Sequence, residues 1–286
     1  MKYSDKQVEV KKTVEQDKPF PGRNTGQMPL LLEEGRSPWT AARFMKERID
    51  HADEFPDLRG YLDVVPLVAY DSKGRSTDIK VVLAVDKNRR ATEKGRKALE
   101  LINRNTDLTS DYAIPLSNEL YDSLPGIVVP RADLGILERD LTEAEFLANK
   151  VWRIVLGNPN EVPAEFAEDA NLMKESYRWV KSQTKQEQNM WVYLDGNSDV
   201  AKLRAFYVSR LVDMSRLDGR FYLNGDGGRL VGYLAPEALN ASVAEERVVR
   251  PYTEADVNPA REQLAELEKF VRPESLDKVK SLVERL

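Results

Sequence analysis

The sequence predicts an α+β fold, with a mixed α/β sheet as the alternative. Two apolar runs, residues 60–71 and 77–86, have strand-like spacing and are separated by a polar Ser-Lys-Gly-Arg turn, which is typical of a β-hairpin. Amphipathic helical segments surround them, without a regular βαβ cadence or an internal repeat. We therefore expect antiparallel hairpins packed with amphipathic helices, an N-terminal arm and a C-terminal pair of helices.

Four segments are expected along the chain. Residues 1–36 form an arm rich in charge, and residues 37–140 form a first α/β half. Residues 141–250 form a second half that contains a hairpin at 220–234, and residues 251–286 form the C-terminal helices. The segment 37–250 is also consistent with a single domain. The arm has one apolar cluster, which predicts docking on its own body or on a neighbouring subunit: Met28, Leu30, Leu31 and Leu32.

In the first half, Ser37 as N-cap and Pro38 at the first helical position predict a helix that begins there. The hairpin follows, and Pro66 within it indicates a sheet edge or a bulge because proline cannot donate to a β-ladder. A basic helix is expected over 89–104, a short helix over 117–124 and a buried strand over 126–130.

In the second half, Thr142 and Glu145 have the spacing of a capping box, and Gly157 can end that helix in a left-handed conformation. A longer helix is expected over 163–185 and a strand over 190–194. Residues 198–214 then show a helical apolar stripe. The last expected strands flank the loop Asn-Gly-Asp-Gly-Gly at 224–228.

Composition excludes several chemistries. The chain has no cysteine, which rules out disulfides, thiolate metal sites and cysteine nucleophiles. Its single histidine, His51, excludes a site with two histidine ligands in one chain, and its acidic surroundings near a helix end are typical of a solvated cap. A net charge of −5 argues against a strongly electrostatic nucleic-acid binder. No apolar run is long enough for a membrane span, and no signal core follows the first lysines, so we expect a cytoplasmic protein without a membrane partner.

Two stretches suggest phosphate binding. The loop at 224–228 lacks the Lys-Ser/Thr pair and the following helix that a phosphate-binding loop needs, so it is interpreted as a hairpin turn, with Asp226 at its tip as a possible contact to a ligand. A basic run is interpreted either as a solvated helix face or as a phosphate-binding surface, without interleaved aromatic residues that could stack on bases: Lys87, Arg89, Arg90, Lys94, Arg96 and Lys97.

Carboxylates offer a second kind of site. Residues 195–199 match the start of a calcium loop, but Val200 and Phe206 stand where that loop needs glycine and glutamate. A helical group at Glu165, Glu168 and Asp169 is interpreted as complementing the helix dipole. The four acids near predicted turns and strand ends that could bind a divalent cation are Asp195, Asp199, Asp218 and Asp226.

Two functional hypotheses follow. The first is a non-catalytic binding or assembly protein that self-associates through the N-terminal arm or the C-terminal helices; it is favoured because no complete catalytic constellation is present. The alternative is a carboxylate-based, metal-dependent hydrolase or phosphotransferase, which requires at least three carboxylates around one cation. The sequence identifies no cofactor.

Overall fold

A computed structural model of the chain describes residues 16–134, 141–184, 190–196, 198–210, 216–220 and 222–237. The C-terminal helices expected over 251–286 and the first 15 residues of the arm lie outside these ranges. Within the described ranges no helix is long and apolar enough to cross a membrane.

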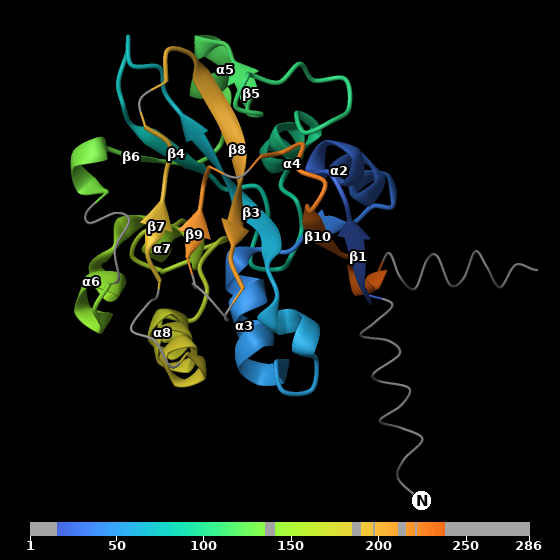
Figure 1. Ribbon diagram of the computed structural model, residues 1–286, viewed down its shortest axis with the longest axis vertical. Coiled ribbons are helices and arrows are strands. Elements are labelled where there is room, and N and C mark those ends of the chain that lie inside the picture. Colours follow the sequence, from blue (N-terminus) through green and yellow to red (C-terminus); the bar gives the residue numbers. More distant parts are fainter. Residues whose placement is uncertain are drawn as a thin grey trace, which may run out of the picture. The chain divides into compact units, whose positions relative to one another are not determined.

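The described residues form helices and two sheets, which confirms the α+β class (Figure 1). The larger sheet has the strand order β6-β4-β3-β8-β9-β7, with β5 paired to β8. Its strands are β3 (Leu62–Tyr70), β4 (Ile79–Val82), β5 (Ile114–Leu116), β6 (Ile127–Val129), β7 (Val192–Tyr193), β8 (Ala201–Val208) and β9 (Leu217–Asp218). The smaller sheet has the order β1-β10-β2, with β1 (Asp17–Pro21), β2 (Ser37–Pro38) and β10 (Arg229–Tyr233).

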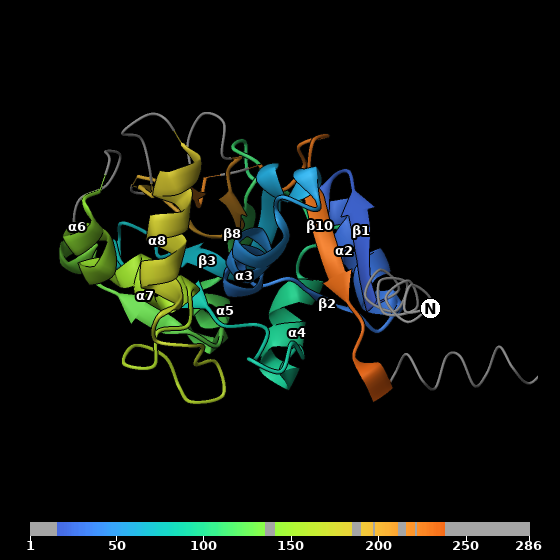
Figure 2. The same ribbon diagram turned by 90° about the horizontal axis from the view of Figure 1, so that it is seen from below.

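Helices pack on both faces of the larger sheet. They are α2 (Asn24–Glu33), α3 (Ala41–His51), α4 (Glu93–Glu100), α5 (Asn118–Ser123), α6 (Glu143–Ala148), α7 (Lys150–Val155) and α8 (Leu172–Gln183). Figure 2 shows α6, α7 and α8 on one side of the view and α2, β1 and β10 on the other. Two short 3-10 helices, Pro56–Arg59 and Arg131–Asp133, complete the described elements.

Two hydrophobic cores follow from this arrangement. Val64, Val68 and Phe206 belong to one core, together with residues of α3, α6, α7 and α8. Leu67, Ala69 and Leu203 belong to the other, together with residues of α2 and α4. Because successive strand residues face opposite sides of a sheet, the central strands supply apolar side chains to both cores.

The expected hairpin is confirmed, since β3 and β4 pair antiparallel. The register of β3 against β8 shifts between Val64 and Leu67, so Pro66 lies at a bulge. β3 has neighbours on both sides, which makes the sheet-edge alternative wrong. A bulge removes the need for a ladder donor at proline even in a central strand.

Part of the N-terminal arm packs on the body of the same chain. β1 pairs with β10 over five residues, and α2 buries Met28, Leu31 and Leu32. Leu30, the fourth member of the predicted apolar cluster, is exposed.

The start of α3 differs from the prediction. Ser37 and Pro38 form β2, and the helix begins at Ala41 with Thr40 as its N-cap. The hydroxyl of Thr40 accepts a hydrogen bond from the Arg43 N–H at 3.0 Å, while Ser37 Oγ accepts one from the Ala91 N–H at 3.0 Å. Pro38 is tolerated because β2 is an edge strand.

The capping box at Thr142 and Glu145 is confirmed, but the helix divides at Asn149 into α6 and α7. The side chain of Asn149 accepts a hydrogen bond from the Trp152 N–H at 3.0 Å and so caps α7. Gly157 has φ +70°, as expected for a left-handed residue after a helix. A Cβ there would lie 2.8 Å from Phe166 O, so a larger residue lacks room.

Three further expectations are wrong. The helix expected over 163–185 is present only as α8, because the N–H of Glu168 donates to Gly157 O and Asp169 Oδ1 accepts from the Asn171 N–H, both outside a helical pattern. Where a helix was expected over 198–214, the described residues form the central strand β8, which is buried on both faces, and residues 211–214 lie outside the described ranges. The described residues do not form the hairpin expected over 220–234: β9 belongs to the larger sheet and β10 to the smaller, so the loop at 222–228 lies between strands of different sheets.

Candidate ligand-binding site

The structure brings Asp195 and Asp218 to the same end of the larger sheet, because β7 and β9 pair in parallel with Tyr193 opposite Asp218. Tyr70 joins the two segments: its hydroxyl donates to Gly219 O at 2.8 Å and accepts from the Asp195 N–H at 3.3 Å. Burial and the neighbouring carboxylates raise the pKa of Tyr70, which keeps this hydroxyl protonated.

Both carboxylates already form ion pairs with basic side chains. Asp195 Oδ2 lies 2.8 Å from both Lys202 Nζ and Arg204 Nε, and Asp218 Oδ2 lies 3.2 Å from Arg216 Nη2. Burial raises the pKa of Asp218. A divalent cation would therefore have to displace lysine or arginine to reach these oxygens.

Asp111 completes this charged group. Its Oδ2 lies 2.7 Å from Lys202 Nζ and 2.6 Å from Arg204 Nη2. Partial burial would raise the pKa of Asp111, but hydrogen bonds from Lys202 and Thr109 and the charge of Arg204 hold it well below its usual range. Both cations are buried on β8, so the paired acids satisfy charges that would otherwise be costly.

The other two candidate acids lie elsewhere. Asp199 is exposed and pairs with Lys73, and Asp226 is exposed with its Oδ1 2.6 Å from Arg23 Nε. In the part of the chain that the structure describes, no group of three or more histidine or acidic side chains could hold a metal ion. Of the acids at 165–169, which the structure places before α8 and outside a helix, Glu168 forms a 2.6 Å ion pair with Lys46. Binding of a divalent cation stays a prediction without a built site among these residues.

The basic run does not converge on one point. Arg90 pairs with Glu237 at 2.8 Å, Arg89 lies over the Tyr233 ring, and Lys87 lines a different pocket. On α4, Arg96 pairs with Glu100 and Lys97 with Glu93, both at 3.0 Å, while Lys94 is exposed. These cations have separate partners and do not share one site, so phosphate binding there stays a prediction without further support.

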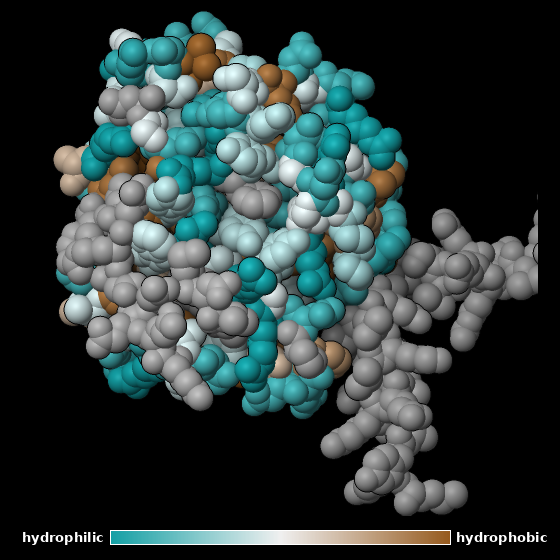
Figure 3. Space-filling model, viewed as in Figure 1, coloured by the Kyte–Doolittle hydropathy of each residue, from teal (hydrophilic) through white to brown (hydrophobic). Residues whose placement is uncertain are grey.

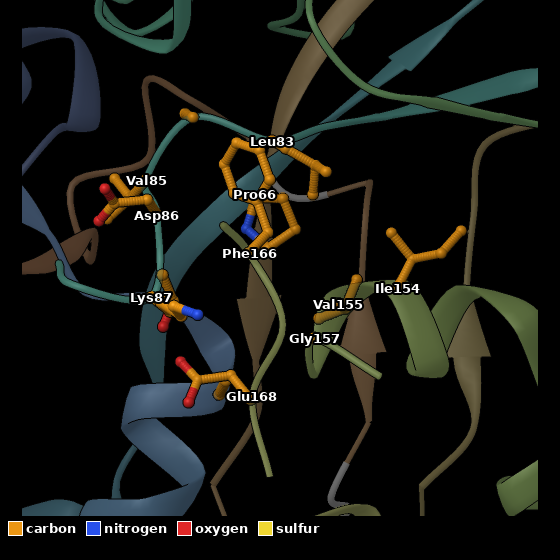
Figure 4. Close-up of a pocket in the computed structure, with 13 residues that line it drawn as sticks. Pro66, Leu83, Val85, Asp86, Lys87, Ile154, Val155, Gly157, Phe166 and Glu168 are labelled. Atoms are coloured by element: carbon orange, nitrogen blue, oxygen red, sulfur yellow. The ribbon is translucent and has the colours of Figure 1, made fainter. Parts of the chain in front are cut away.

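One pocket lies between the β4–α4 connection and α7 (Figure 4). Pro66 and Phe166 supply part of its apolar lining, and Lys87 and Glu168 supply charged groups. Its cavity volume is about 30 Å³, enough for a water molecule but not for a metabolite.

A more promising surface was missed by the sequence reasoning. We call it the aromatic–arginine surface, and its members are Trp191, Tyr193, Tyr207, Arg216 and Arg220, all partly exposed. The rings of Trp191 and Tyr193 stack with centroids 5.8 Å apart. The Arg216 guanidinium lies over both rings, 5.7 Å and 5.2 Å from their centroids, and Arg220 also lies over Tyr193.

Strand pairing places these side chains together. Asp218 lies opposite both Tyr193 and Tyr207 in the register, so the three residues share one face of the sheet. Tyr207 stacks on Tyr61 at 5.3 Å, and the Tyr61 hydroxyl donates to Gly227 O at 2.6 Å. Burial raises the pKa of Tyr207 to about 12. The surface thus extends from β7 across β9 and β8 to the loop at 222–228.

The sequence held one signal for this surface. The alternation of Trp191, Val192, Tyr193 and Leu194 places Val192 and Leu194 in the core and the aromatic residues on the opposite face. No local pattern predicted that Arg216, Arg220 and Tyr207 belong to this surface. Their neighbours in space are distant in sequence, and Tyr207 was expected to lie in a helix.

One described face of the molecule is mainly hydrophilic. Figure 3 shows teal side chains over most of it, with brown, hydrophobic ones scattered among them.

No family model and no curated protein matches the sequence significantly. A solved structure, described as "Accommodation of massive sequence variation in Nanoarchaeota by the C-type lectin fold", is similar to 77% of this chain and 98% of its own length. The TM-score is 0.50 and the sequence identity 15%. This similarity concerns the fold alone: the chain has an α+β architecture resembling the C-type lectin fold.

Proposed function

We propose that the protein is a non-catalytic binding protein that recognises another protein through the aromatic–arginine surface. The observation that carries the proposal is the stacking of Trp191 and Tyr193 beneath the Arg216 guanidinium. Tryptophan, tyrosine and arginine are the residues most enriched among those that dominate binding energy at protein interfaces. The resemblance to the C-type lectin fold agrees with a binding role.

The geometry favours a protein over a saccharide. Arg216 and Arg220 lie over the Tyr193 ring, so they compete with a sugar ring for its face. Among the described residues there is also no acidic cluster to hold a metal that could coordinate sugar hydroxyls. Arginine stacked on aromatic rings is instead well placed to meet the carboxylates and carbonyls of a polypeptide.

The test compares protein capture by matched variants. Arg220→Glu reverses one charge in the surface, and Lys94→Glu reverses one charge on the exposed side of α4. Each immobilised variant is incubated with an extract of the encoding organism, and retained proteins are quantified by mass spectrometry. We expect at least one protein that is retained equally by the unchanged chain and Lys94→Glu and retained about thirtyfold less by Arg220→Glu, since loss of a hot-spot residue costs about 2 kcal/mol or more.

Identical retained sets for the two variants would refute the proposal. A glycan array provides the second arm: selective saccharide binding that Trp191→Ala abolishes would replace the protein partner by a sugar. Self-association through residues 1–36 or 251–286 is a separate prediction, and sedimentation of the full chain against a chain lacking residues 239–286 tests its C-terminal part.

A further inference from the structure

A polar hollow opens where the start of α2, the turn after α4 and the loop at 222–228 meet. Its volume is about 480 Å³, which is in the range of small-molecule sites. Polar side chains dominate its lining, which comprises Arg23, Thr25, Gly26, Gln27, Arg104 and Asn224. None of these lining residues is a member of the aromatic–arginine surface, although the loop at 222–228 borders both, and the inference does not depend on the proposed function.

Arg104 supplies the first binding group. Its side chain lies against the first turn of α2, with Nε 3.5 Å from the position that a Cβ at Gly26 would take. Within the described residues it makes no hydrogen bond or ion pair. Its five N–H donors are therefore available at the wall of the hollow.

Arg23 supplies the second group, and it is held by a carboxylate. Arg23 Nε donates to Asp226 Oδ1 at 2.6 Å, and this hydrogen bond lowers the pKa of Asp226. Both side chains are exposed, so the pair is weak and a ligand could exchange for it. The Asp226 carboxylate thus binds the Arg23 guanidinium in the way that an anionic group of a ligand would.

Two neighbouring features extend the site. The hollow lies at the N-terminus of α2, whose first turn contains no acidic residue, so the helix dipole adds a favourable potential for an anion. Tyr222, two residues before Asn224, is 53% exposed and packs edge-on against Tyr112, which is 46% exposed. The Leu223 N–H donates to Tyr112 O at 3.3 Å, which ties Tyr112 to the loop that contributes Asn224 to the hollow.

From this geometry we infer that the hollow binds a phosphate or sulfate group of a small organic ligand, between Arg23 and Arg104, with the ligand's ring against Tyr222. Guanidinium groups bind these oxyanions through paired N–H donors. Binding releases Asp226 from Arg23, so Asp226 acts as an internal competitor.

The test is an NMR titration of the full chain at constant ionic strength. The probes are inorganic phosphate, inorganic sulfate, glucose 6-phosphate and glucose, with sodium chloride as the balancing salt. Three variants are compared: Arg104→Gln, Asp226→Asn, and Lys174→Gln as a control that removes an equal charge from the exposed side of α8. Whichever inorganic anion binds more tightly, phosphate or sulfate, identifies the group of the ligand that the hollow recognises.

We expect Arg104→Gln to weaken binding of that anion about tenfold and Asp226→Asn to strengthen it several-fold, with Lys174→Gln unchanged. Equal weakening by Arg104→Gln and Lys174→Gln would show a nonspecific charge effect and overturn the inference. Weaker binding by Asp226→Asn would overturn the competitor role. Tyr222→Ala tests the contact with the ligand's ring. It should weaken the binding of glucose 6-phosphate and leave the binding of inorganic phosphate unchanged. Equal effects on the binding of both probes would exclude a contact between Tyr222 and the ring.

Discussion

We expect the protein to become less stable as pH rises from about 4 to 7, because the buried side chain of Asp63 loses its proton over this range. The residue lies on β3 with 0% exposure, and its Oδ2 accepts a hydrogen bond from the Arg229 N–H at 2.6 Å. Within the described residues, Oδ1 has no hydrogen-bond partner. Burial raises the pKa of Asp63 from 3.8 to about 7, although the Arg229 N–H and the nearby Asn24 side chain oppose the rise.

The direction follows from proton binding. A folded-state pKa above the unfolded value means that the folded protein binds this proton more tightly. Stability is therefore greatest below the unfolded pKa of 3.8, falls as pH rises, and becomes constant above the folded pKa of about 7. A shift of about 3 units corresponds to ~4 kcal/mol, and structural relaxation around the charged form brings the expected loss to about 2–4 kcal/mol.

Asp63→Asn tests this by removing the titration while keeping an oxygen acceptor for the Arg229 N–H. Urea unfolding at pH 4, 5.5, 7 and 8 gives the free energy of unfolding of both proteins. We expect a small difference at pH 4, and the variant to be more stable by about 2–4 kcal/mol at pH 8. Other titrating groups, including Asp218, cancel in this difference.

Asp57→Asn is the control, because Asp57 also contacts Arg229, at 3.1 Å, but is exposed. Its effect should stay within about 0.5 kcal/mol at every pH. A difference between the unchanged chain and Asp63→Asn that is constant from pH 4 to 8 would refute the reasoning, since it would show that Asp63 keeps an ordinary pKa in the folded state.

Two further substitutions test local structure. From helix propensity alone, Gly95→Ala should raise the free energy of unfolding by about 1 kcal/mol. The new Cβ would lie 2.1 Å from Ala84 O, however, so we expect urea unfolding to show destabilisation by more than ~2 kcal/mol. Gly74→Ala, with no atom within 4 Å of the new Cβ, is the control, and equal effects would contradict the packing argument. Thr142→Ala should lose about 1 kcal/mol because it removes the capping box with Glu145, whereas Thr142→Ser should retain most of it; thermal unfolding that does not separate these two variants would contradict this role.

Features specified by neighbouring residues were predictable from sequence. Residues close together in sequence determine three such features: the β3–β4 hairpin, the capping box of Thr142 and the left-handed conformation of Gly157. The missing N–H donor of proline predicted either a bulge or a sheet edge at Pro66, and the structure has the bulge. Burial of Met28 in the arm followed from its apolar neighbours, although the element that covers it did not.

The candidate sites were less predictable. Asp195 and Asp218 do lie at the same end of the sheet, but both are neutralised by cations. Lys202 and Arg204, which pair with Asp195, come from β8, which its apolar spacing wrongly assigned to a helix, and Arg216, just before β9, pairs with Asp218. Leu203 and Tyr207 fit a helical stripe, yet both core faces of the sheet require the same residues to alternate as a strand. Tertiary burial on two sides outweighs local propensity there.

The loop at 222–228 shows where local information ends. Its sequence lacks the Lys-Ser/Thr pair that a nucleotide-binding loop needs at fixed spacing, and strand β10 follows it in place of the required helix. Local turn chemistry did not predict that the flanking strands join different sheets, since β9 pairs with β7 and β8 whereas β10 pairs with β1 and β2, which are far away in sequence. Only tertiary structure joins this loop to Arg23 and Arg104 at one hollow, because hydrogen bonds and packing between distant segments decide which side chains meet.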